Sequence, residues 1–518
     1  MSLSIRYKLV TFLLSAMSIL LMRCRQEQHG INYLGQEPPG FNAEGFAAGK
    51  ISTDSMEHSS PAFSPDGKVV LWTVLDRSYH ASMMEMTFEN GKWSAPHQPT
   101  FADSTADDYY PSFSPDGKKL YFSSRRKVPA GFPEGRGIRI WQVDRNENKW
   151  GRPIPFDTTV SKGENYAHSI SKDGSLYYSA SHGGAINWCL RKAQRTDDHY
   201  LESELLPYSI NSVGYEDGPY IAPDESFLIF ESQRPEGMGA SGDLYISFKN
   251  SDGGWNVPVN MGQKINSTAT ERFARLSPDG KYLFFGSTRN NSATNIGFDI
   301  FWIDAKIIDE LKKEATAQSR IDLPLGQEIL FSLINNEIDS ASRKLSRWLF
   351  LHPNSLDATV IYSSLLRKQK DFSQADVLLT GSSPSWRANT SIIMEKALVK
   401  FGMNEDNDAI NLLAPIFVKS DQLRERYIYL SLALLDMEKF EVSDDYFEKA
   451  MAIHASPSPY FRRGCAYARI GQIDRAFPVL ERAFELGMRL GKEYEDNPDL
   501  TPLKSDARWK KLLHKMGG

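Results

Sequence analysis

A four-residue phrase occurs five times in the first three hundred residues of this chain. Three copies read Ser-Pro-Asp-Gly, at residues 64–67, 114–117 and 277–280; residues 171–174 read Ser-Lys-Asp-Gly and residues 222–225 read Ala-Pro-Asp-Glu. Successive copies lie about 50 to 57 residues apart. A fixed period of this size indicates stacked or radial repeats, so it constrains the fold strongly.

Each copy lies between two apolar runs of strand type, such as residues 111–113 and 119–123. Pro presets φ, Asp bonds to nearby backbone and Gly adopts a positive φ, so the phrase predicts the tip of a β-hairpin. Another strand follows, as at residues 137–141 and 297–302, and several periods then have a Gly-Trp turn and a short Pro-containing edge segment. Four strands in each period are typical of a propeller blade.

These residues resemble the TolB-like, WD-like propeller repeats of bacterial envelope proteins. The resemblance covers residues 30–305 and departs at Lys172, which replaces Pro, and at Glu225, which replaces Gly. It implies an all-β propeller with a role in envelope assembly. We expect five blades, with six as the alternative because related propellers commonly have six. Residues 46–51 are candidates for the outer strand that closes the ring.

The second half of the chain predicts helices. Small residues recur there with a spacing of 34 residues, and finally of 33, at Ala341, Ala375, Ala409, Ser443 and Ala476. This is the tetratricopeptide period, in which a small side chain is needed where the two helices of a repeat cross. We expect a helical linker over residues 306–324 and an all-α tetratricopeptide solenoid of about five repeats over residues 325–518.

The N-terminus, residues 1–24, has the pattern of a targeting segment. Arg6 and Lys8 precede an apolar run over residues 9–22, which is short for a spanning helix and matches the apolar core of a secretory signal. Cys24 then suggests a lipoprotein signal whose cysteine is acylated, but Arg23 stands where a small residue is expected. An uncleaved membrane anchor and an ordinary cleaved signal are the alternatives. We expect a protein of the bacterial periplasm or outer membrane.

Composition and motifs argue against several classes of function. The formal net charge is −5, so no global basic field attracts nucleic acid. Cys189 and Cys465 lie in different predicted domains, and no CxxC metal or redox motif is present. Residues 237–242 match the GxGxxG pattern of dinucleotide-binding proteins. A strand-type segment follows them, however, where a dinucleotide site needs a helix. We therefore expect no cofactor, no metal and no enzyme activity.

One acid and one base recur in each predicted blade. The acids precede the hairpin tip by six or seven residues: Glu57, Asp107, Glu164, Glu216 and Glu271. The bases follow the second strand: Arg77, Arg125 or Arg126, His182, Arg234 and Arg289. If the first strand of each blade lines the axis, the acids gather at one mouth of the channel, where they are candidates to bind a cation or polar ligand. Because the pattern recurs in every blade, we favour ion pairs that fix the blades.

Blade three breaks the repetition. It has Tyr166, His168 and His182 where the other blades mainly use Pro or Arg. Identical blades cannot make one asymmetric site, so these residues are the further candidates for ligand binding at the channel mouth. No acidic or Cys partner at metal-ligand spacing accompanies the two histidines, and a metal site is not predicted.

The predicted architecture favours binding over chemistry, because repeat proteins present wide preformed surfaces. Tetratricopeptide arrays bind peptide segments in their concave groove. The sequence thus favours a non-enzymatic interaction or scaffold protein of the cell envelope, whose propeller and solenoid each bind protein or envelope partners. The alternatives are a propeller hydrolase or lyase acting on carbohydrate or peptide, and a sensor whose propeller binds a glycan or small ligand.

Overall fold

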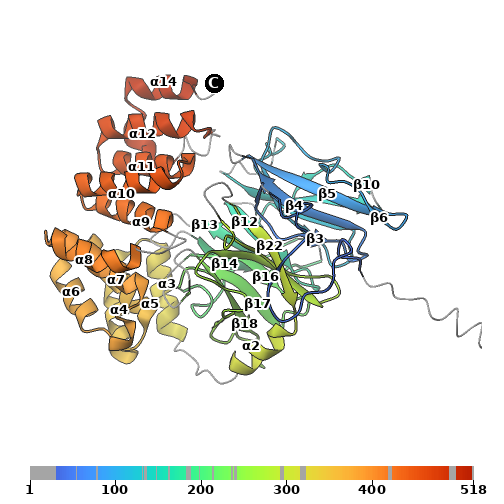
Figure 1. The fold of residues 1–518 in the computed structure, drawn as a ribbon, viewed down its shortest axis with the longest axis horizontal. Helices are drawn as coiled ribbons and strands as arrows, with labels where there is room; N and C mark the ends of the chain where they lie inside the picture. Colours follow the sequence, from blue (N-terminus) through green and yellow to red (C-terminus); the bar gives the residue numbers. More distant parts are fainter. Residues whose placement is uncertain are drawn as a thin grey trace, which may run out of the picture.

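A computed structural model shows a β-propeller with a curved stack of helices beside it (Figure 1). It describes residues 31–53, 55–76, 80–130, 132, 137–147, 149–160, 164–181, 188–197, 199–212, 215–234, 237–238, 242–251, 253–291, 297–315, 323–417, 423–488 and 497–515. Three residues named from the sequence, Cys24, Arg77 and His182, lie outside these ranges.

Five antiparallel sheets form the five blades that the repeat predicted. Blade 1 contains β2 (Met56–Glu57), β3 (Ala62–Phe63), β4 (Val69–Leu75), β5 (Ala81–Glu89) and β6 (Lys92–Trp93). Blade 2 contains β7 (Asp108–Phe113), β8 (Lys119–Ser124), β9 (Arg139–Asn146), β10 (Lys149–Trp150) and β11 (Ile154–Pro155). Blade 3 contains β12 (Asn165–Ile170), β13 (Leu176–Ser181), β14 (Trp188–Ala193) and β15 (Glu204–Leu205). Blade 4 contains β16 (Glu216–Ile221), β17 (Phe227–Ser232), β18 (Asp243–Phe248) and β19 (Val259–Asn260). Blade 5 contains β20 (Glu271–Leu276), β21 (Tyr282–Ser287), β22 (Asp299–Asp304) and, from the N-terminus, β1 (Glu44–Gly45).

The recurring phrase forms the hairpin tips, as predicted. The glycines of four tips have positive φ, at 67° for Gly67, 69° for Gly117, 89° for Gly174 and 70° for Gly280. Blade 4 has Glu225 at this position, also at a positive φ of 57°. Its carboxylate accepts from Lys192 Nζ at 2.9 Å and from Lys249 Nζ at 2.5 Å. These two ion pairs help to hold Glu225 at a positive φ, which is unfavourable for a residue other than glycine. The two departures from the phrase therefore leave the turn intact.

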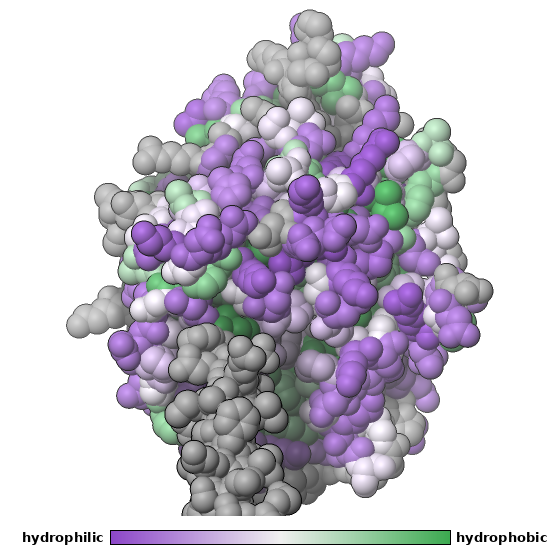
Figure 2. Space-filling model, turned by 90° about the vertical axis from the view of Figure 1, so that its right-hand side faces the viewer, coloured by the Kyte–Doolittle hydropathy of each residue, from purple (hydrophilic) through white to green (hydrophobic). Residues whose placement is uncertain are grey.

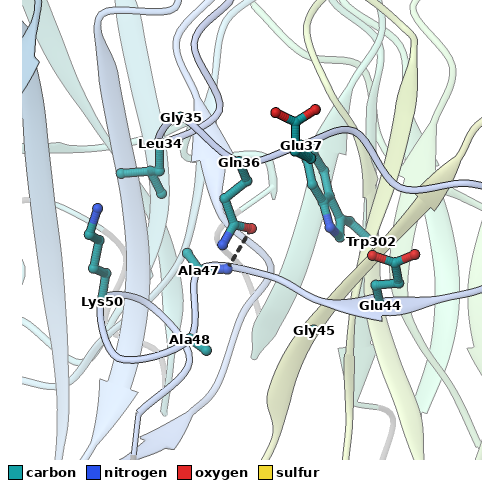
Figure 3. Close-up of a pocket in the computed structure, with 10 residues that line it drawn as sticks. All are labelled: Leu34, Gly35, Gln36, Glu37, Glu44, Gly45, Ala47, Ala48, Lys50 and Trp302. Atoms are coloured by element: carbon teal, nitrogen blue, oxygen red, sulfur yellow. Dashed lines mark hydrogen bonds between the residues drawn. The ribbon is translucent and has the colours of Figure 1, made fainter.

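The N-terminal segment closes the ring of blades. Strand β1 pairs with β22 as the outer strand of blade 5, and the backbone N–H of Phe46 donates to Ile300 O at 2.7 Å. The ring is closed by an N-terminal strand, as predicted, but this strand ends at Gly45, directly before the predicted segment of residues 46–51. A surface pocket lies at this seam, between the turn after Leu34 and the turn after β1 (Figure 3). Gln36 Oε1 accepts from the backbone N–H of Ala47 at 2.9 Å and ties the two turns together.

Helical hairpins form the second half of the molecule. The helices are α2 (Ile307–Ala315), α3 (Leu323–Ile334), α4 (Ile338–Leu351), α5 (Leu356–Lys368), α6 (Phe372–Thr380), α7 (Thr390–Gly402), α8 (Asp406–Phe417), α9 (Leu423–Asp436), α10 (Phe440–Ile453), α11 (Pro457–Arg469), α12 (Ile473–Glu485) and α14 (Ala507–Lys515), with 3₁₀ helices η2 (Pro384–Trp386) and η3 (Pro498–Leu503). Helix α2 packs on the propeller, where Ile308 and Leu311 join the core shared by blades 4 and 5. The hairpins from α3 to α12 form the solenoid.

The solenoid has the predicted 34-residue period. The small residues that define it all lie on the second helix of a hairpin, and each is fully buried: Ala341, Ala375, Ala409, Ser443 and Ala476. A second periodic feature is the residue that ends the turn before these helices. It has a positive φ in every hairpin, at Asn336, Lys370, Asn404, Glu438 and Gly471. A close helix crossing and a left-handed turn residue therefore repeat together.

The propeller and the solenoid share one hydrophobic core. Cys189 and Tyr208 of blade 3 and its following loop pack in the same buried cluster as Ile329 and Trp348 of the first hairpin. The rings of Tyr208 and Trp348 meet edge to face, with centroids 5.3 Å apart. Gln327 Oε1 also accepts from the backbone N–H of Tyr208 at 3.2 Å. The two repeat arrays are thus packed together and not merely tethered.

The surface is mostly polar on the side of the molecule seen in Figure 2, where hydrophilic residues predominate. None of the helices in the described part of the chain has both the length and the hydropathy that a membrane crossing requires.

Candidate ligand-binding site at the propeller axis

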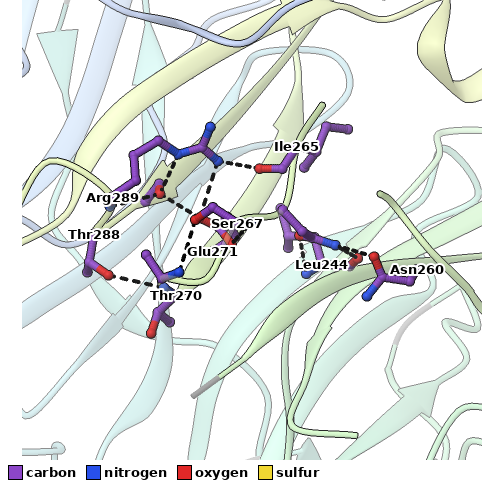
Figure 4. A network of polar contacts seen from close by, with 11 residues as sticks. Leu244, Asn260, Ile265, Ser267, Thr270, Glu271, Thr288 and Arg289 are labelled. Atoms are coloured by element: carbon purple, nitrogen blue, oxygen red, sulfur yellow. Dashed lines mark hydrogen bonds and ion pairs between the residues drawn. The ribbon is translucent and has the colours of Figure 1, made fainter. Parts of the chain in front are cut away.

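Two of the predicted acids, Glu216 and Glu271, each pair with an arginine and with two serines of their own blade. Glu271, wholly buried, accepts from Ser267 Oγ at 2.7 Å, from Ser287 Oγ at 2.6 Å and from Arg289 Nη2 at 3.2 Å (Figure 4). Glu216 repeats this arrangement with Ser212, Ser232 and Arg234. In blade 2 the acid that occupies the same register is Asp108, which binds Arg126 through both oxygens at 3.1 and 2.6 Å. These acid–base pairs link the first and second strands of a blade.

The remaining predicted acids lie in different surroundings. Glu57 is wholly buried, and its Oε1 accepts from Thr53 Oγ1 at 2.8 Å. Asp107 directly precedes β7. Its Oδ1 lies 2.5 Å from His80 Nδ1, and its Oδ2 lies 3.7 Å from Nε of Arg125, one of the two bases predicted for this blade. Glu164 precedes β12, with its side chain against Gly137. In blade 3, Asn165 occupies the strand position that Glu216 and Glu271 occupy in their blades. Asn165 directly follows Glu164, the residue that the sequence pattern predicted there.

The inner strands carry a shared irregularity that turns side chains toward the axis. The pairing of the first with the second strand shifts register after Tyr109, Asn165, Asp217 and Arg272. Tyr110, Gly218 and Phe273 have positive φ at these shifts, with values of 53°, 59° and 57°. A bulge of this kind re-aims neighbouring side chains.

An almost continuous circle of aromatic side chains surrounds the axis at this end of the propeller. We call it the axial belt and define it as His58, Tyr109, Tyr166, Trp188, Tyr215, Arg272 and Phe298. Successive members lie close together: His58–Tyr109 6.1 Å, Tyr109–Tyr166 5.9 Å, Tyr166–Trp188 5.4 Å, Trp188–Tyr215 6.3 Å, Tyr215–Arg272 5.9 Å, Arg272–Phe298 5.9 Å and Phe298–His58 6.1 Å, measured to ring centroids. All except Tyr109 are half-buried. The belt therefore presents parts of several flat side chains to solvent.

A charged group interrupts the aromatic circle on one side. Arg272 pairs with Glu231 and, at 3.1 Å, with Asp217. Asp217 also accepts from Ser179 Oγ at 2.5 Å and from the Tyr215 hydroxyl at 2.7 Å. Burial raises the pKa of Glu231 to about 8, although the positive charge of Arg272 acts to lower it. Burial together with the charge of Arg272 lowers the pKa of His58 to about 3, so this ring is neutral near pH 7.

The structure brings only one of the predicted candidates, Tyr166, into the axial belt. His168 is two residues further along β12 and is buried, with Nδ1 lying 3.3 Å from Ser123 Oγ. The sequence search missed the other belt members because they differ in every blade, and a search for repeated residues cannot detect them. For His58, Tyr109 and Arg272 the available signal was their position, one residue after the acid position or its equivalent, which Tyr166 shares. Trp188, Tyr215 and Phe298 stand at other positions of the repeat.

In the described part of the chain, no group of three or more His, Cys, Asp or Glu side chains is arranged to hold a metal ion. Cys189 and Cys465 are buried free thiols. Burial raises the pKa of Cys465 to about 12.

Comparisons with known proteins leave the function open. No protein-family model matches the sequence, and no curated protein matches it. Among solved structures, a putative TolB from Agrobacterium tumefaciens is 20% identical over 44% of this chain and 69% of that chain, with a TM-score of 0.30. MamA is 18% identical over 30% of this chain and 92% of that chain, with a TM-score of 0.22. A gluconolactonase from Xanthomonas campestris is 14% identical over 47% of this chain and 69% of that chain, with a TM-score of 0.28.

Proposed function

We propose that this chain is a non-enzymatic interaction protein of the bacterial cell envelope, and that the axial belt is where its propeller binds a partner. The observation that carries the proposal is the belt itself: mostly half-buried aromatic side chains, contributed by all five blades and gathered around one axis. Flat aromatic faces bind apolar groups, sugar rings and cations.

The side chains of the belt indicate what kind of group it accepts. Asp217 pairs with Arg272, and Glu231, whose pKa is raised to about 8, is mostly protonated at pH 7, so the charges at the belt balance. Aromatic faces in this setting favour a flat or cationic side chain, such as an arginine in an exposed segment of a protein partner. Asp107, Glu216 and Glu271 are engaged in ion pairs within their own blades, which favours binding over acid–base catalysis.

The solenoid supplies the second surface of the proposed scaffold. Polar side chains connect the first helices of three successive hairpins, α5, α7 and α9. Arg367 of α5 donates to the carboxylate of Glu395 on α7 at 3.1 and 3.2 Å, and the hydroxyl of Tyr429 on α9 donates to the same carboxylate at 2.9 Å. Tyr429 is 46% exposed, so its ring is accessible from outside. First-helix side chains are the ones that tetratricopeptide arrays use to bind peptides. The N-terminal segment with Cys24 would anchor the protein to a membrane as a lipoprotein.

The test is a cross-linking pull-down from native membranes with the full chain. We would compare the unaltered protein with Tyr166→Ala/Trp188→Ala in the belt and with Tyr429→Ala in the solenoid. Ile154→Ala, which truncates an exposed side chain on an outer strand of blade 2, is the control. We expect the belt variant and the solenoid variant to lose different proteins. Loss of the same proteins from all three variants, or from none, would refute the two-surface scaffold.

A propeller hydrolase or lyase is the second candidate, because Glu231 combines a raised pKa with a neighbouring carboxylate, as general acids often do. Release of product from model glycosides or peptides by the purified chain, abolished in Glu231→Gln, would replace the binding proposal with this one.

A further inference from the structure

A second arginine of the inner strand, Arg275, crosses the propeller axis. It lies on β20 of blade 5, three residues beyond Arg272, and its Nη1 donates to Ser112 Oγ at 2.9 Å. Ser112 lies on β7 of blade 2. Blades 2 and 5 are not neighbours in a ring of five, so this hydrogen bond spans the centre of the propeller.

Arg275 lacks the carboxylate partner that several other enclosed arginines of the molecule have. Arg126, Arg234, Arg289, Arg367 and Arg463 each pair with a carboxylate. In the described part of the chain, Arg275 has the Ser112 hydroxyl and no carboxylate. Burial lowers the pKa of Arg275 to about 10, which remains high enough for the guanidinium to be charged at pH 7. An enclosed charge is costly without a counter-charge.

A polar atom without a partner lies near this arginine. His168, on β12 of blade 3, is 2% exposed, and its Nε2 makes no hydrogen bond within the described residues. The charge of Arg275 acts on this imidazole and, together with burial, lowers its pKa to about 3. Blades 2, 3 and 5 thus contribute a hydroxyl, an imidazole and a guanidinium to one region at the axis.

We propose that the propeller binds a small oxyanion at its axis, held by Arg275 and Ser112 and bordered by His168. A phosphate, sulfate or carboxylate group accepts two parallel hydrogen bonds from a guanidinium, and it supplies the missing counter-charge. The Ser112 hydroxyl rotates to donate a further hydrogen bond once the anion accepts from Arg275. This site is distinct from the axial belt and does not depend on the proposed scaffold function.

Thermal unfolding of the full chain with added salts tests the proposal. Inorganic phosphate, sulfate and acetate would each be compared with chloride at equal ionic strength, and calorimetric titration with the effective salt would give a Kd. We expect a saturable rise in Tm, because an anion that binds only the folded state stabilises it. A rise with phosphate and sulfate identifies a tetrahedral oxyanion, and a rise with acetate identifies a carboxylate; either supports the site.

Variants distinguish this site from general salt effects. Arg275→Met should lose the rise in Tm and weaken the measured Kd by about tenfold or more, because it removes charge-assisted hydrogen bonds. Ser112→Ala, which keeps the charge, should weaken binding less. Lys281→Met removes one exposed positive charge from the same blade and should retain the full effect. An equal rise in Arg275→Met, or no rise in the unaltered protein, would overturn the proposal. The belt variant Tyr166→Ala/Trp188→Ala should keep the anion effect, which separates the two sites.

Discussion

Three arginines in blade 5 have different roles because their partners differ. Arg289 pairs with Glu271 inside the blade, and its guanidinium also lies 4.7 Å from the ring centroid of Phe301. Arg272 shares two carboxylates at the belt, and Arg275 reaches a serine across the axis. At the scale of single residues, the identity of a side chain therefore says less about its role than the groups that surround it.

Removal of Arg289 should be more damaging than removal of the whole pair. Arg289→Met leaves the buried Glu271 without its positive partner, and we expect it to lower the free energy of unfolding by on the order of 3 kcal/mol. Glu271→Gln in the same chain removes the uncompensated charge and should recover part of this loss. Urea denaturation followed by circular dichroism measures both variants. Equal stability of the single and the double variant would show that the pair contributes no charge interaction.

The buried carboxyl of Glu57 should make stability depend on pH. Burial raises its pKa from 4.5 to about 8, and its Oε2 has no hydrogen-bond partner among the described residues. Between these pH values the folded chain retains a proton that the unfolded chain has released, so stability falls as pH rises through this window and levels off above it. The contribution is at most about 1.4 kcal/mol for each pH unit.

Measurements of Tm from pH 5 to pH 9 with Glu57→Gln check this expectation. The variant cannot ionise at this position, so its Tm should fall less with rising pH than the Tm of the unaltered protein. Glu44→Gln, at an exposed position on β1, should follow the unaltered protein. Parallel curves for the unaltered protein and Glu57→Gln would contradict the raised pKa.

At the scale of elements, the sequence predicts what repeats and misses what does not. The hairpin tips and the small residues of the second helices were found because turn chemistry and helix crossing demand the same residue type in every copy. Asp107 was assigned the place of Asp108 because the spacing from the tip varies by one residue between blades. The belt was missed because its members differ in residue type, and only four of them, at positions 58, 109, 166 and 272, share one place in the repeat. The bulge that turns them toward the axis depends on strand pairing, which spacing alone does not give.

Enlarging one periodic small residue should destabilise its hairpin. Ala409 on α8 is fully buried in a cluster with Leu398 and Phe401 of α7. Ala409→Leu inserts a larger side chain where the helices cross, and we expect a loss of about 1–3 kcal/mol from overpacking. The next residue, Ile410, is 50% exposed, and Ile410→Ala should change stability by about 0.5 kcal/mol or less. Urea denaturation compares the two. A neutral Ala409→Leu would mean that the hairpin tolerates a wider crossing than the structure has.

At the scale of the whole molecule, the two repeat arrays depend on each other. Blade 3, its following loop and the first helical hairpin fill one hydrophobic cluster, so separating the arrays would expose apolar surface on both. This contact was not predicted from the sequence, because Tyr208 and Trp348 belong to different repeats and neither stands out in its own period. A shared core fixes the orientation of the propeller axis relative to the solenoid, and a scaffold that presents two partners to each other needs such a fixed orientation.

A substitution at Gly326 tests whether the shared core makes the molecule unfold as one unit. A Cβ at Gly326 would stand 2.5 Å from the ring of Tyr208, so Gly326→Val forces the ring away and opens the contact between the arrays. We expect differential scanning calorimetry to show one transition for the unaltered chain and two for Gly326→Val, because each array then unfolds without the other. Adding Tyr208→Ala to Gly326→Val removes the clash and should bring the two transitions closer together, since neighbouring substitutions are not additive. Two transitions in the unaltered chain would mean that the arrays unfold independently despite their common core.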